Sequence, residues 1–148
     1  MTIAVYCRVS TVRQKTDSQV AEITKWLTAN GYDEDQIQWF SDKETGKTLH
    51  RTQFNKLQKA IFAGEVRTVV VWKLDRISRR LRDGINLLAD WCDRGVRVVS
   101  ITQAIDLTGA VGRMIAAVAV AANSAIVDAP PRQIARSAAA YARSIRSQ

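Results

Sequence analysis

Two short segments of the chain combine a hydroxyl group with arginine side chains, a pairing suited to phosphate chemistry. The first segment, YCRVS, runs from Tyr6 to Ser10 with Arg8 at its centre. Alternate side chains of a strand share one face, so a strand here presents Tyr6, Arg8 and Ser10 together, with Cys7 and Val9 on the other side. The hydroxyl and the guanidinium then lie at the carboxyl end of the strand, where open α/β sheets bind ligands. The segment alone also fits a turn capped by Ser10, with Arg8 as a surface cation.

The second segment, KLDRISRRLRD, follows a valine-rich run and leads into an expected helix. Between its first and last residues it carries the carboxylate of Asp75 and four closely spaced guanidinium groups, those of Arg76, Arg79, Arg80 and Arg82. Unpaired N–H groups make helix N-termini positive, so arginines there are unfavourable unless an anion is bound. A helix with a basic, solvated face is the alternative, but it favours acidic residues four positions away, and only Asp83 offers one to Arg79. We therefore favour an anion site.

A serine among arginines points to phosphoryl transfer more than to acyl transfer. Serine hydrolases need an imidazole base, whereas the single histidine, His50, stands in a polar segment. Phosphoryl transfer mainly requires positioning and stabilisation of charge on the phosphate oxygens, which guanidinium groups provide. The expected substrate is a phosphodiester.

The charge of the chain agrees with a polyanionic partner. Its 148 residues include 22 Lys and Arg against 14 Asp and Glu, a net charge of +8, and arginine outnumbers lysine 15 to 7. Such a field attracts nucleic acid, and the arginine fork fits phosphate oxygens well. A basic balance that only keeps a small protein soluble is the alternative.

The elements that position these groups follow from apolar periodicity. We expect an α/β fold, a layered and mostly parallel sheet with helices on both faces. The run Thr68–Trp72 reads as a central strand because its consecutive valines suit burial on both sides. A first helix is expected to begin at a capping box formed by Thr16 and Gln19, and two more are expected over 54–61 and 81–91. The other strands are expected over 2–7, 37–40 and 96–101. Loops are expected over 41–51 and 102–108.

The last forty residues differ from the rest. Gly109–Ala125 is apolar nearly all round, which predicts a helix covered on more than one side, either by a second subunit or by the chain's own core. Pro130 and Pro131 end it, and the basic tail after them either becomes ordered on a partner or stays solvated. The expected domains are 1–108 as the functional unit, 109–129 as an interface helix and 130–148 as a tail.

Several classes are disfavoured. Cys7 and Cys92 stand apart from each other and from any paired histidine, so neither a disulfide framework nor a zinc site is expected. The N-terminus lacks the layout of a signal peptide, and the longest near-apolar run, Met114–Ala122, is far shorter than a membrane span. We expect a soluble, cytoplasmic protein with no membrane association.

Four motifs together carry a family resemblance. They are YCRVST followed by Gln14 and Gln19, FSD with Gly46 and Arg51, VWKLDRISR, and DLTGAVGRM before the apolar helix. In this order they resemble the catalytic domain of the serine recombinases, the resolvase and DNA invertase family, over about Ile3–Val120. One motif alone is weak, but four in sequence are specific.

The resemblance implies roles residue by residue. Ser10 matches the nucleophile that attacks a DNA phosphodiester and becomes covalently linked to the 5′ end. Arg8, Arg76 and Arg79 match residues that bind the scissile phosphate, Arg51 matches a further arginine of that pocket, and Asp75 matches a carboxylate beside them. Tyr6, Gln19 and Asp42 match supporting positions, and no general base is assigned. The resemblance also implies a homodimer that forms tetramers on DNA, without metal or nucleotide cofactor.

The resemblance weakens beyond Ala121. Family members continue this helix through a Glu-Arg pair, where this chain has Ile126 and Val127, and the residues after Pro131 are too few for a helix-turn-helix. The leading hypothesis is a truncated recombinase catalytic domain, acting in DNA inversion, resolution or integration within a mobile element. An inactive fragment that dimerises or interferes is the alternative. A nucleotide-binding α/β protein is a third reading, disfavoured because no glycine-rich loop follows the first strand.

Overall fold

The computed structural model describes residues 2–9, 13–45, 48–49, 51–78, 80–109, 112 and 114–115. Their strands form one sheet of six, in the order β3-β2-β1-β4-β5-β6. The strands are β1 (Thr2–Val9), β2 (Ile37–Thr45), β3 (Thr48–Leu49), β4 (Val66–Val71), β5 (Arg97–Ser100) and β6 (Ile105–Leu107). The helices are α1 (Arg13–Ala29), α2 (Thr52–Phe62) and α3 (Leu81–Asp93), with 3₁₀ turns η1 (Glu34–Gln36) and η2 (Leu74–Arg76).

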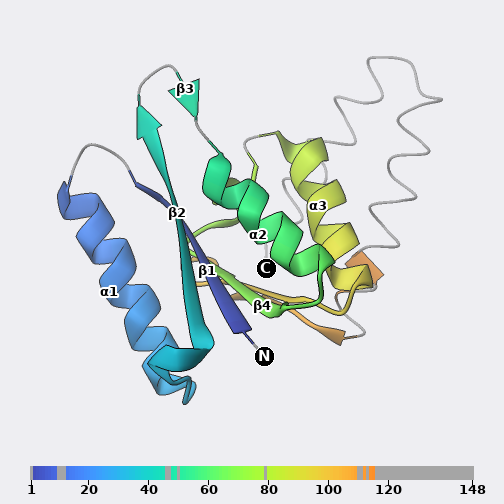
Figure 1. Cartoon of the computed structure of the whole chain (residues 1–148), viewed down its shortest axis with the longest axis horizontal. Helices are drawn as coiled ribbons and strands as arrows, with labels where there is room; N and C mark the ends of the chain where they lie inside the picture. Colours follow the sequence, from blue (N-terminus) through green and yellow to red (C-terminus); the bar gives the residue numbers. More distant parts are fainter. Residues whose placement is uncertain are drawn as a thin grey trace.

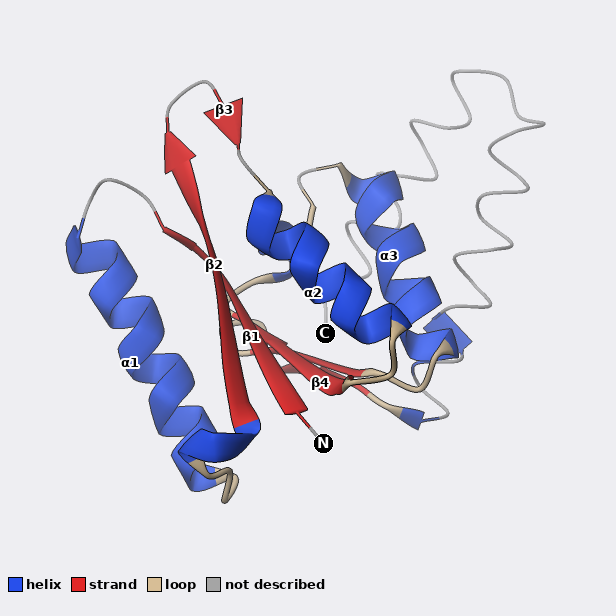
Figure 2. Cartoon of the chain, in the orientation of Figure 1, coloured by secondary structure: helices blue, strands red, loops and turns tan. Residues whose placement is uncertain are grey.

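The sheet is mostly parallel and has helices on both faces. Strands β2, β1, β4 and β5 run parallel, whereas the edge strands β3 and β6 pair antiparallel with their neighbours. Helix α1 covers one face, and α2 and α3 lie on the other (Figures 1 and 2). The α/β class predicted from the sequence is confirmed, as is the central place of β4 between β1 and β5.

Two apolar layers fix the orientation of β1. Ala4 and Tyr6 pack with Phe54 of α2 and Trp91 of α3 on one side of the sheet. Ile3, Val5 and Cys7 pack with Ile23 and Leu27 of α1 on the other. Tyr6 and Cys7 therefore face opposite sides of the sheet, as the alternation predicted, and the structure places Tyr6 on the α2 side.

The loop predicted over 41–51 is wrong in most of its length. Strand β2 continues to Thr45 and pairs with β3, with Glu44 opposite Leu49. The strand escaped prediction because the residues that alternate with Phe40 are Asp42 and Glu44, so its inward face shows no apolar periodicity. The loop predicted over 102–108 likewise contains β6, which is only three residues long.

Helix boundaries agree with the sequence except at the first helix. Helix α1 begins at Arg13, so Thr16 and Gln19 lie inside it and do not form the predicted capping box. Polar residues fill the first turns of α1, which is why apolar periodicity detects the helix only from Val20 onward. Helices α2 and α3 contain the predicted ranges 54–61 and 81–91.

The predicted interface helix and tail lie almost wholly outside the described residues. Within that region, Ile115 packs against the α2 and α3 side of the core, and Met114 is 70% exposed. A side chain at Gly112 would meet Cys92 Sγ at 3.1 Å, so the chain passes very close to α3 there. None of the helices in the described ranges is long and apolar enough to cross a membrane.

Candidate active site

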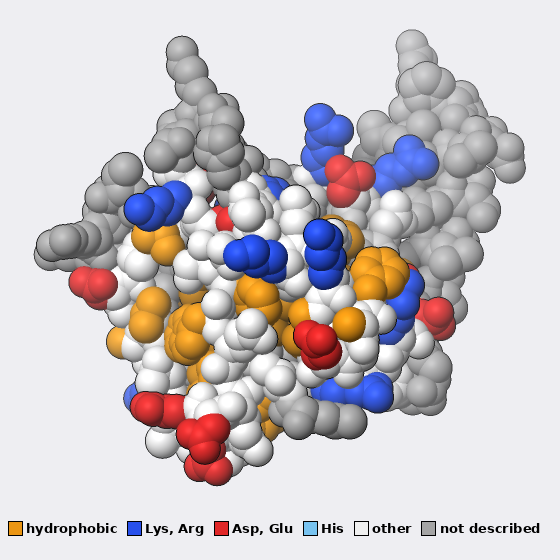
Figure 3. All heavy atoms as spheres, in the orientation of Figure 1, with side chains coloured by type: hydrophobic (Ala, Val, Ile, Leu, Met, Phe, Trp, Pro, Cys, Tyr) orange, Lys and Arg blue, Asp and Glu red, His pale blue; other side chains and the backbone are white. Residues whose placement is uncertain are grey.

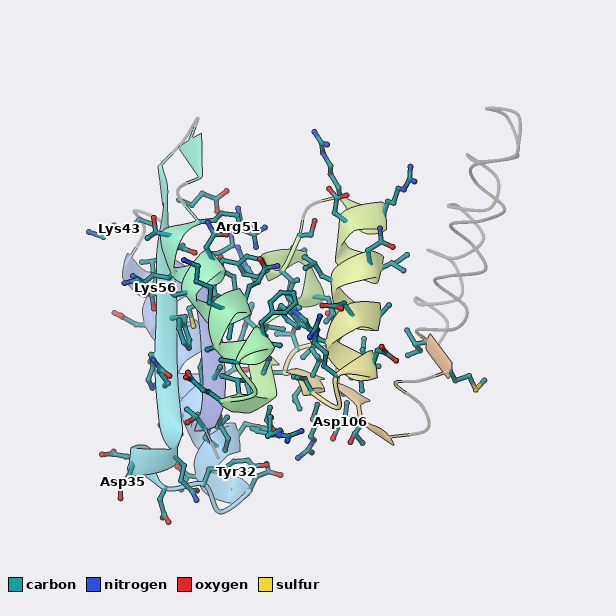
Figure 4. The ribbon with its side chains drawn as sticks, turned by 45° about the vertical axis from the view of Figure 1, so that its right-hand side comes forward. Tyr32, Asp35, Lys43, Arg51, Lys56 and Asp106 are labelled. Carbon is teal, nitrogen blue, oxygen red and sulfur yellow. The ribbon has the colours of Figure 1, made fainter. Side chains whose placement is uncertain are left out.

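Six of the polar residues picked out from the sequence lie where β1, β2 and β4 end: Tyr6, Arg8, Asp42, Arg51, Asp75 and Arg76. These strands are parallel, so their carboxyl ends lie at one edge of the sheet, and the Cα positions of Arg8 and Asp42 are paired in register. Figure 4 shows Arg51 at the start of α2 near Lys43 at the end of β2, with Tyr32 and Asp35 at the opposite end of the molecule.

Asp42 is a buried carboxylate that joins β1, β2 and α2. Its Oδ2 accepts hydrogen bonds from the Tyr6 hydroxyl at 3.0 Å and the Phe54 N–H at 2.9 Å, and its Oδ1 accepts one from the Gln53 N–H at 2.9 Å. A carboxylate at this point satisfies otherwise unpaired N–H groups of the first helical turn and complements the helix dipole. Asp42 therefore fixes where α2 begins.

Arg51 is held at that same helix start. It occupies the N-cap position of α2, and its Nη2 donates a hydrogen bond to the backbone carbonyl of Ile77. Its guanidinium carbon lies 3.7 Å from the ring centroid of Phe54 and 6.0 Å from that of Tyr6. The stacked, planar group thus links α2 to the segment that follows η2.

Arg8 lies in the interior, and the reading of it as a surface cation is wrong. The residue is only 4% exposed. Its Nη1 donates to the backbone carbonyl of Asp75 at 3.5 Å, and its Nη2 lies 3.2 Å from Glu44 Oε1. Arg8 and Arg51 therefore both contact the chain between residues 75 and 77, from two different elements.

The 3₁₀ turn η2 brings a third guanidinium to this edge. Arg76 is partly buried, with its Nε 3.8 Å from Asp75 Oδ1, while the Asp75 side chain is 64% exposed. Burial raises the pKa of the Cys7 thiol to about 11, and the charge of Arg76 opposes this rise. Arg76 ends η2, and this turn contacts β1, so Arg76 lies near the end of that strand.

The phenol of Tyr6 is kept neutral in this environment. Burial raises the pKa of Tyr6 to about 12; the neighbouring Arg51 opposes the rise and the Asp42 carboxylate adds to it. Tyr6 therefore acts at neutral pH as a hydrogen-bond donor to Asp42.

The arginine-rich segment spans two places, the turn after β4 and the start of α3. Arg76 ends η2, whereas Arg80 is the N-cap residue of α3 and Arg82 is exposed in its first turn. A short break after η2 separates the two groups, because the chain must turn between the end of β4 and the start of α3. Among the arginines of this segment that the structure describes, Arg76 is the one that lies at the cluster.

Two of the predicted site residues, Ser10 and Arg79, lie outside the described residues. Gln19 is half-buried on α1, and the described part of the chain shows no hydrogen bond from it to the cluster. One contributor was missed: Glu44, whose signal in the sequence is its position two residues after Asp42, hence on the same face of β2.

The arrangement suits an anion with several oxygens. Arg8, Arg51 and Arg76 reach one edge of the sheet from β1, the start of α2 and η2. Guanidinium groups in fixed orientations donate paired hydrogen bonds to phosphate or carboxylate oxygens. Asp42 already accepts three hydrogen bonds from within the chain, and these position α2 relative to β1.

Comparison with known proteins decides the family. The family model described as the resolvase N-terminal domain matches residues 3–143. The chain belongs to the resolvase family of serine recombinases. It is 36% identical over 108 residues to the DNA-invertase hin of Salmonella typhimurium, across 73% of this chain and 52% of that protein. It is 32% identical over 134 residues to the transposon Tn3 resolvase of Escherichia coli, across 90% of this chain and 66% of that protein.

Solved structures agree with the family. The N-terminal catalytic domain of TP901-1 integrase is 31% identical and superposes with a TM-score of 0.66, covering 84% of this chain and 95% of that domain. A resolvase family site-specific recombinase from Streptococcus pneumoniae has the same fold, with a TM-score of 0.65 at 24% identity over 97% of this chain and 99% of that one. The chain spans about half the length of the curated invertase that it matches.

Proposed function

We propose that this chain is the catalytic domain of a site-specific DNA recombinase that cleaves and rejoins DNA through a covalent phosphoserine intermediate. The observation that supports it most is the meeting of Arg8, Arg51 and Arg76 at the edge of the sheet where β1 leads toward Ser10. Family membership supplies the chemistry for which such a cluster is suited.

The proposed reaction is a transesterification at phosphorus. The Ser10 oxygen attacks the scissile phosphodiester, a serine–phosphate ester forms with the 5′ end, and the bond to the 3′ oxygen breaks. The serine proton is lost, the 3′ oxygen gains one and leaves as a hydroxyl, and rejoining is the reverse step. The energy of the broken bond is conserved in the intermediate, so religation needs no nucleotide cofactor.

Each residue of the cluster has a role in this proposal. Arg8, Arg51 and Arg76, together with Arg79, bind the phosphate and stabilise the charge that grows on its non-bridging oxygens. Asp75 lies beside Arg76 and assists the leaving oxygen or orients the arginine. Tyr6 and Asp42 position α2, and Gln19 remains a supporting residue by resemblance alone.

The surface charge is compatible with DNA at this edge. The acidic residues Asp33, Glu34 and Asp35 gather around η1, before β2 begins, whereas the arginine cluster lies where β2 ends. Figure 3 shows the densest group of acidic side chains at one lower corner of the face, while most of the basic side chains lie over its middle and upper parts. A DNA backbone approaching the carboxyl ends of the strands therefore avoids the acidic corner.

The assembly is part of the same proposal. We propose that the chain acts as a homodimer that pairs into a tetramer on DNA, with residues 109–129 as the interface after a catalytic unit spanning 1–108. Strand exchange between two sites requires four nucleophiles, one for each cut strand, which such a tetramer supplies.

A trapping experiment tests the activity. The chain is incubated with nicked crossover DNA of invertase and resolvase type, in which the released fragment diffuses away and prevents rejoining. A covalent protein–DNA adduct on a denaturing gel is expected for the unmodified chain and for Ser18→Ala, an exposed serine on α1. Its loss in Ser10→Ala supports the proposal. An unmodified chain that gives no adduct with any crossover DNA contradicts it.

A further inference from the structure

Glu44 makes a contact that the proposed reaction does not explain. It lies on β2 two residues after Asp42, so both side chains turn to the same face. Its Oε1 lies 3.2 Å from Nη2 of Arg8; the Arg8 side chain is 3% exposed and that of Glu44 is 23% exposed. An anion from within the chain thus already faces an arginine that is proposed to bind phosphate.

The two carboxylates beside Arg8 and Arg51 differ in how deeply they are buried. Asp42 is buried and accepts hydrogen bonds from one hydroxyl and two backbone N–H groups at 2.9–3.0 Å. Glu44 is partly open to solvent, and its contact with Arg8 is longer than the 2.7–2.9 Å usual for a charge-assisted hydrogen bond. Because Glu44 already borders solvent whereas Asp42 is buried, Glu44 is the carboxylate that moves into water more readily.

The hydrogen bond of Arg8 to the chain after β4 is also weak enough to be exchanged. Its Nη1 reaches the backbone carbonyl of Asp75 at 3.5 Å, at the outer limit for a hydrogen bond. A phosphate oxygen is a stronger, charged acceptor for the same donor. A buried guanidinium still needs a counter-charge before any phosphate arrives, and Glu44 supplies it.

We propose that Glu44 is a positioning residue that balances Arg8 in the empty site and is displaced when the scissile phosphate binds. The inference rests on the proposed function, because it takes Arg8 as a phosphate ligand. If phosphate bound Arg8 while Glu44 kept its position, two anions would lie around one guanidinium. Their repulsion moves the Glu44 carboxylate, which borders solvent, into water. Glu44 thereby holds Arg8 in position and competes with the substrate.

The first test uses inorganic phosphate, so it does not depend on the DNA sequence. Phosphate is titrated into the chain while the Nε–Hε resonance of Arg8 is followed by NMR, with Arg8→Lys to assign that resonance. Glu44→Gln keeps the shape of the side chain and removes its charge. The phosphate concentration at the midpoint of the titration is therefore expected to fall about tenfold, equivalent to ~1.4 kcal/mol. Glu44→Asp retains the charge and is expected to keep the midpoint close to that of the unmodified chain.

A matched control separates competition from general charge. Glu34→Gln makes the same change in an exposed residue before β2, at the opposite end of that strand, and is expected to leave the midpoint unchanged. If Glu44 only orients Arg8, Glu44→Gln weakens phosphate binding instead of strengthening it. A raised or unaltered midpoint in Glu44→Gln, or an Arg8 resonance that phosphate does not move, overturns the inference.

A second measurement uses the unmodified chain, so it stands even if a variant fails to fold. The carboxyl carbon resonance of Glu44 is expected to shift at the same phosphate concentration as the Arg8 resonance. An adduct in the trapping experiment without these effects removes only the role of Glu44. Phosphate exchange at Arg8 without any adduct leaves this exchange standing and contradicts the proposed recombinase activity.

Discussion

The hydrogen bond between the hydroxyl of Tyr6 and the carboxylate of Asp42 is part of a contact that joins strand β1 to helix α2. Tyr6 on β1 donates to Asp42 Oδ2 at 3.0 Å, and the N–H of Phe54 in α2 donates to the same oxygen at 2.9 Å. Because Arg51 is the N-cap residue of α2, this shared acceptor also sets the place of Arg51 relative to Arg8. The geometry of the arginine cluster therefore depends on one buried acid.

Replacing that acid by its amide is expected to be costly. In Asp42→Asn, the new NH₂ group must face either the N–H of Gln53 or the donors at Oδ2, and each of these pairs a donor with a donor. Leaving a buried donor unsatisfied costs about 1–3 kcal/mol, so we expect the free energy of unfolding in urea to fall by about 2–3 kcal/mol. Asp35→Asn, in the exposed turn η1, is the control, with an expected change below about 0.5 kcal/mol. Equal effects of the two variants contradict this account of Asp42.

Tyr6 gives the fold a weakness at high pH. Its pKa is raised from 10.0 to about 12 in the folded chain, so the folded state keeps the phenol proton where the unfolded state has lost it. Stability from this group is complete below about pH 10 and is lost as the pH rises from 10 to 12. The loss is roughly 2–3 kcal/mol, since each unit of pKa difference corresponds to about 1.4 kcal/mol. Urea unfolding between pH 8 and 12 measures it.

The variant Tyr6→Phe provides the comparison for that pH series. It removes the titrating group, so the decline in its stability between pH 10 and 12 is expected to be shallower than in the unmodified chain. At pH 7 the variant loses the hydrogen bond to Asp42, a cost of about 1 kcal/mol. Parallel pH curves for the two proteins show that Tyr6 does not titrate as described.

The sequence predicts the parts of the fold that are built on apolar periodicity. Consecutive valines identify β4 as central, and spacings of three and four identify α2 and α3. The alternation in the first segment also places Tyr6 and Cys7 correctly on opposite faces of β1. Burial drives all of these, so the pattern of apolar residues records them directly.

The remaining parts depend on polar contacts between distant positions. The second half of β2 turns Asp42 and Glu44 inward, where Tyr6, α2 and Arg8 receive them, and such long-range pairing has no local pattern. Arg51 is fixed by the backbone carbonyl of Ile77, an acceptor that every residue type offers. Family resemblance identified Asp42 and Arg51. The structure adds that both act at the start of α2, where Asp42 accepts two backbone N–H groups and Arg51 is the N-cap residue.

A second acid–base pair, distant from the site, is expected to show opposite pH behaviour. Arg97 of β5 forms two hydrogen bonds with Asp106 of β6, Nε to Oδ1 at 2.9 Å and Nη2 to Oδ2 at 2.6 Å. These bonds hold the pKa of Asp106 below its usual value, so the stability they add is present above the unfolded pKa and is lost as the pH falls through the folded one.

The variant Asp106→Asn tests this pair. The carboxylate is 43% exposed, and solvent screens the interaction, so the expected loss at pH 7 is only about 0.5–1 kcal/mol. The difference between the variant and the unmodified chain should shrink as the pH falls below about 4, where the carboxylate gains its proton in both states. A difference that stays constant down to pH 2 contradicts the assignment.

Arg51 and Arg94 allow a matched test of geometry against charge. Each stacks on a phenylalanine, Arg51 on Phe54 at 3.7 Å and Arg94 on Phe62 at 4.0 Å, but Arg94 lies at the carboxyl end of α3. Lysine keeps the charge in both variants and loses the planar fork. We expect Arg51→Lys and Arg94→Lys each to cost about 0.5–1 kcal/mol of unfolding free energy.

Their effects on the proposed cleavage should differ sharply. Arg51→Lys removes the fork that contacts the Ile77 carbonyl and, in the proposed reaction, the phosphate; adduct formation should fall at least about tenfold, the effect of ~1.4 kcal/mol in the transition state. Arg94→Lys should form the adduct at the unmodified rate. Rates from the trapping experiment, measured beside urea unfolding of the same samples, separate the two effects. Equal rates for the two variants at equal stability show that the charge of Arg51 suffices and that its stacked orientation does not contribute to the reaction.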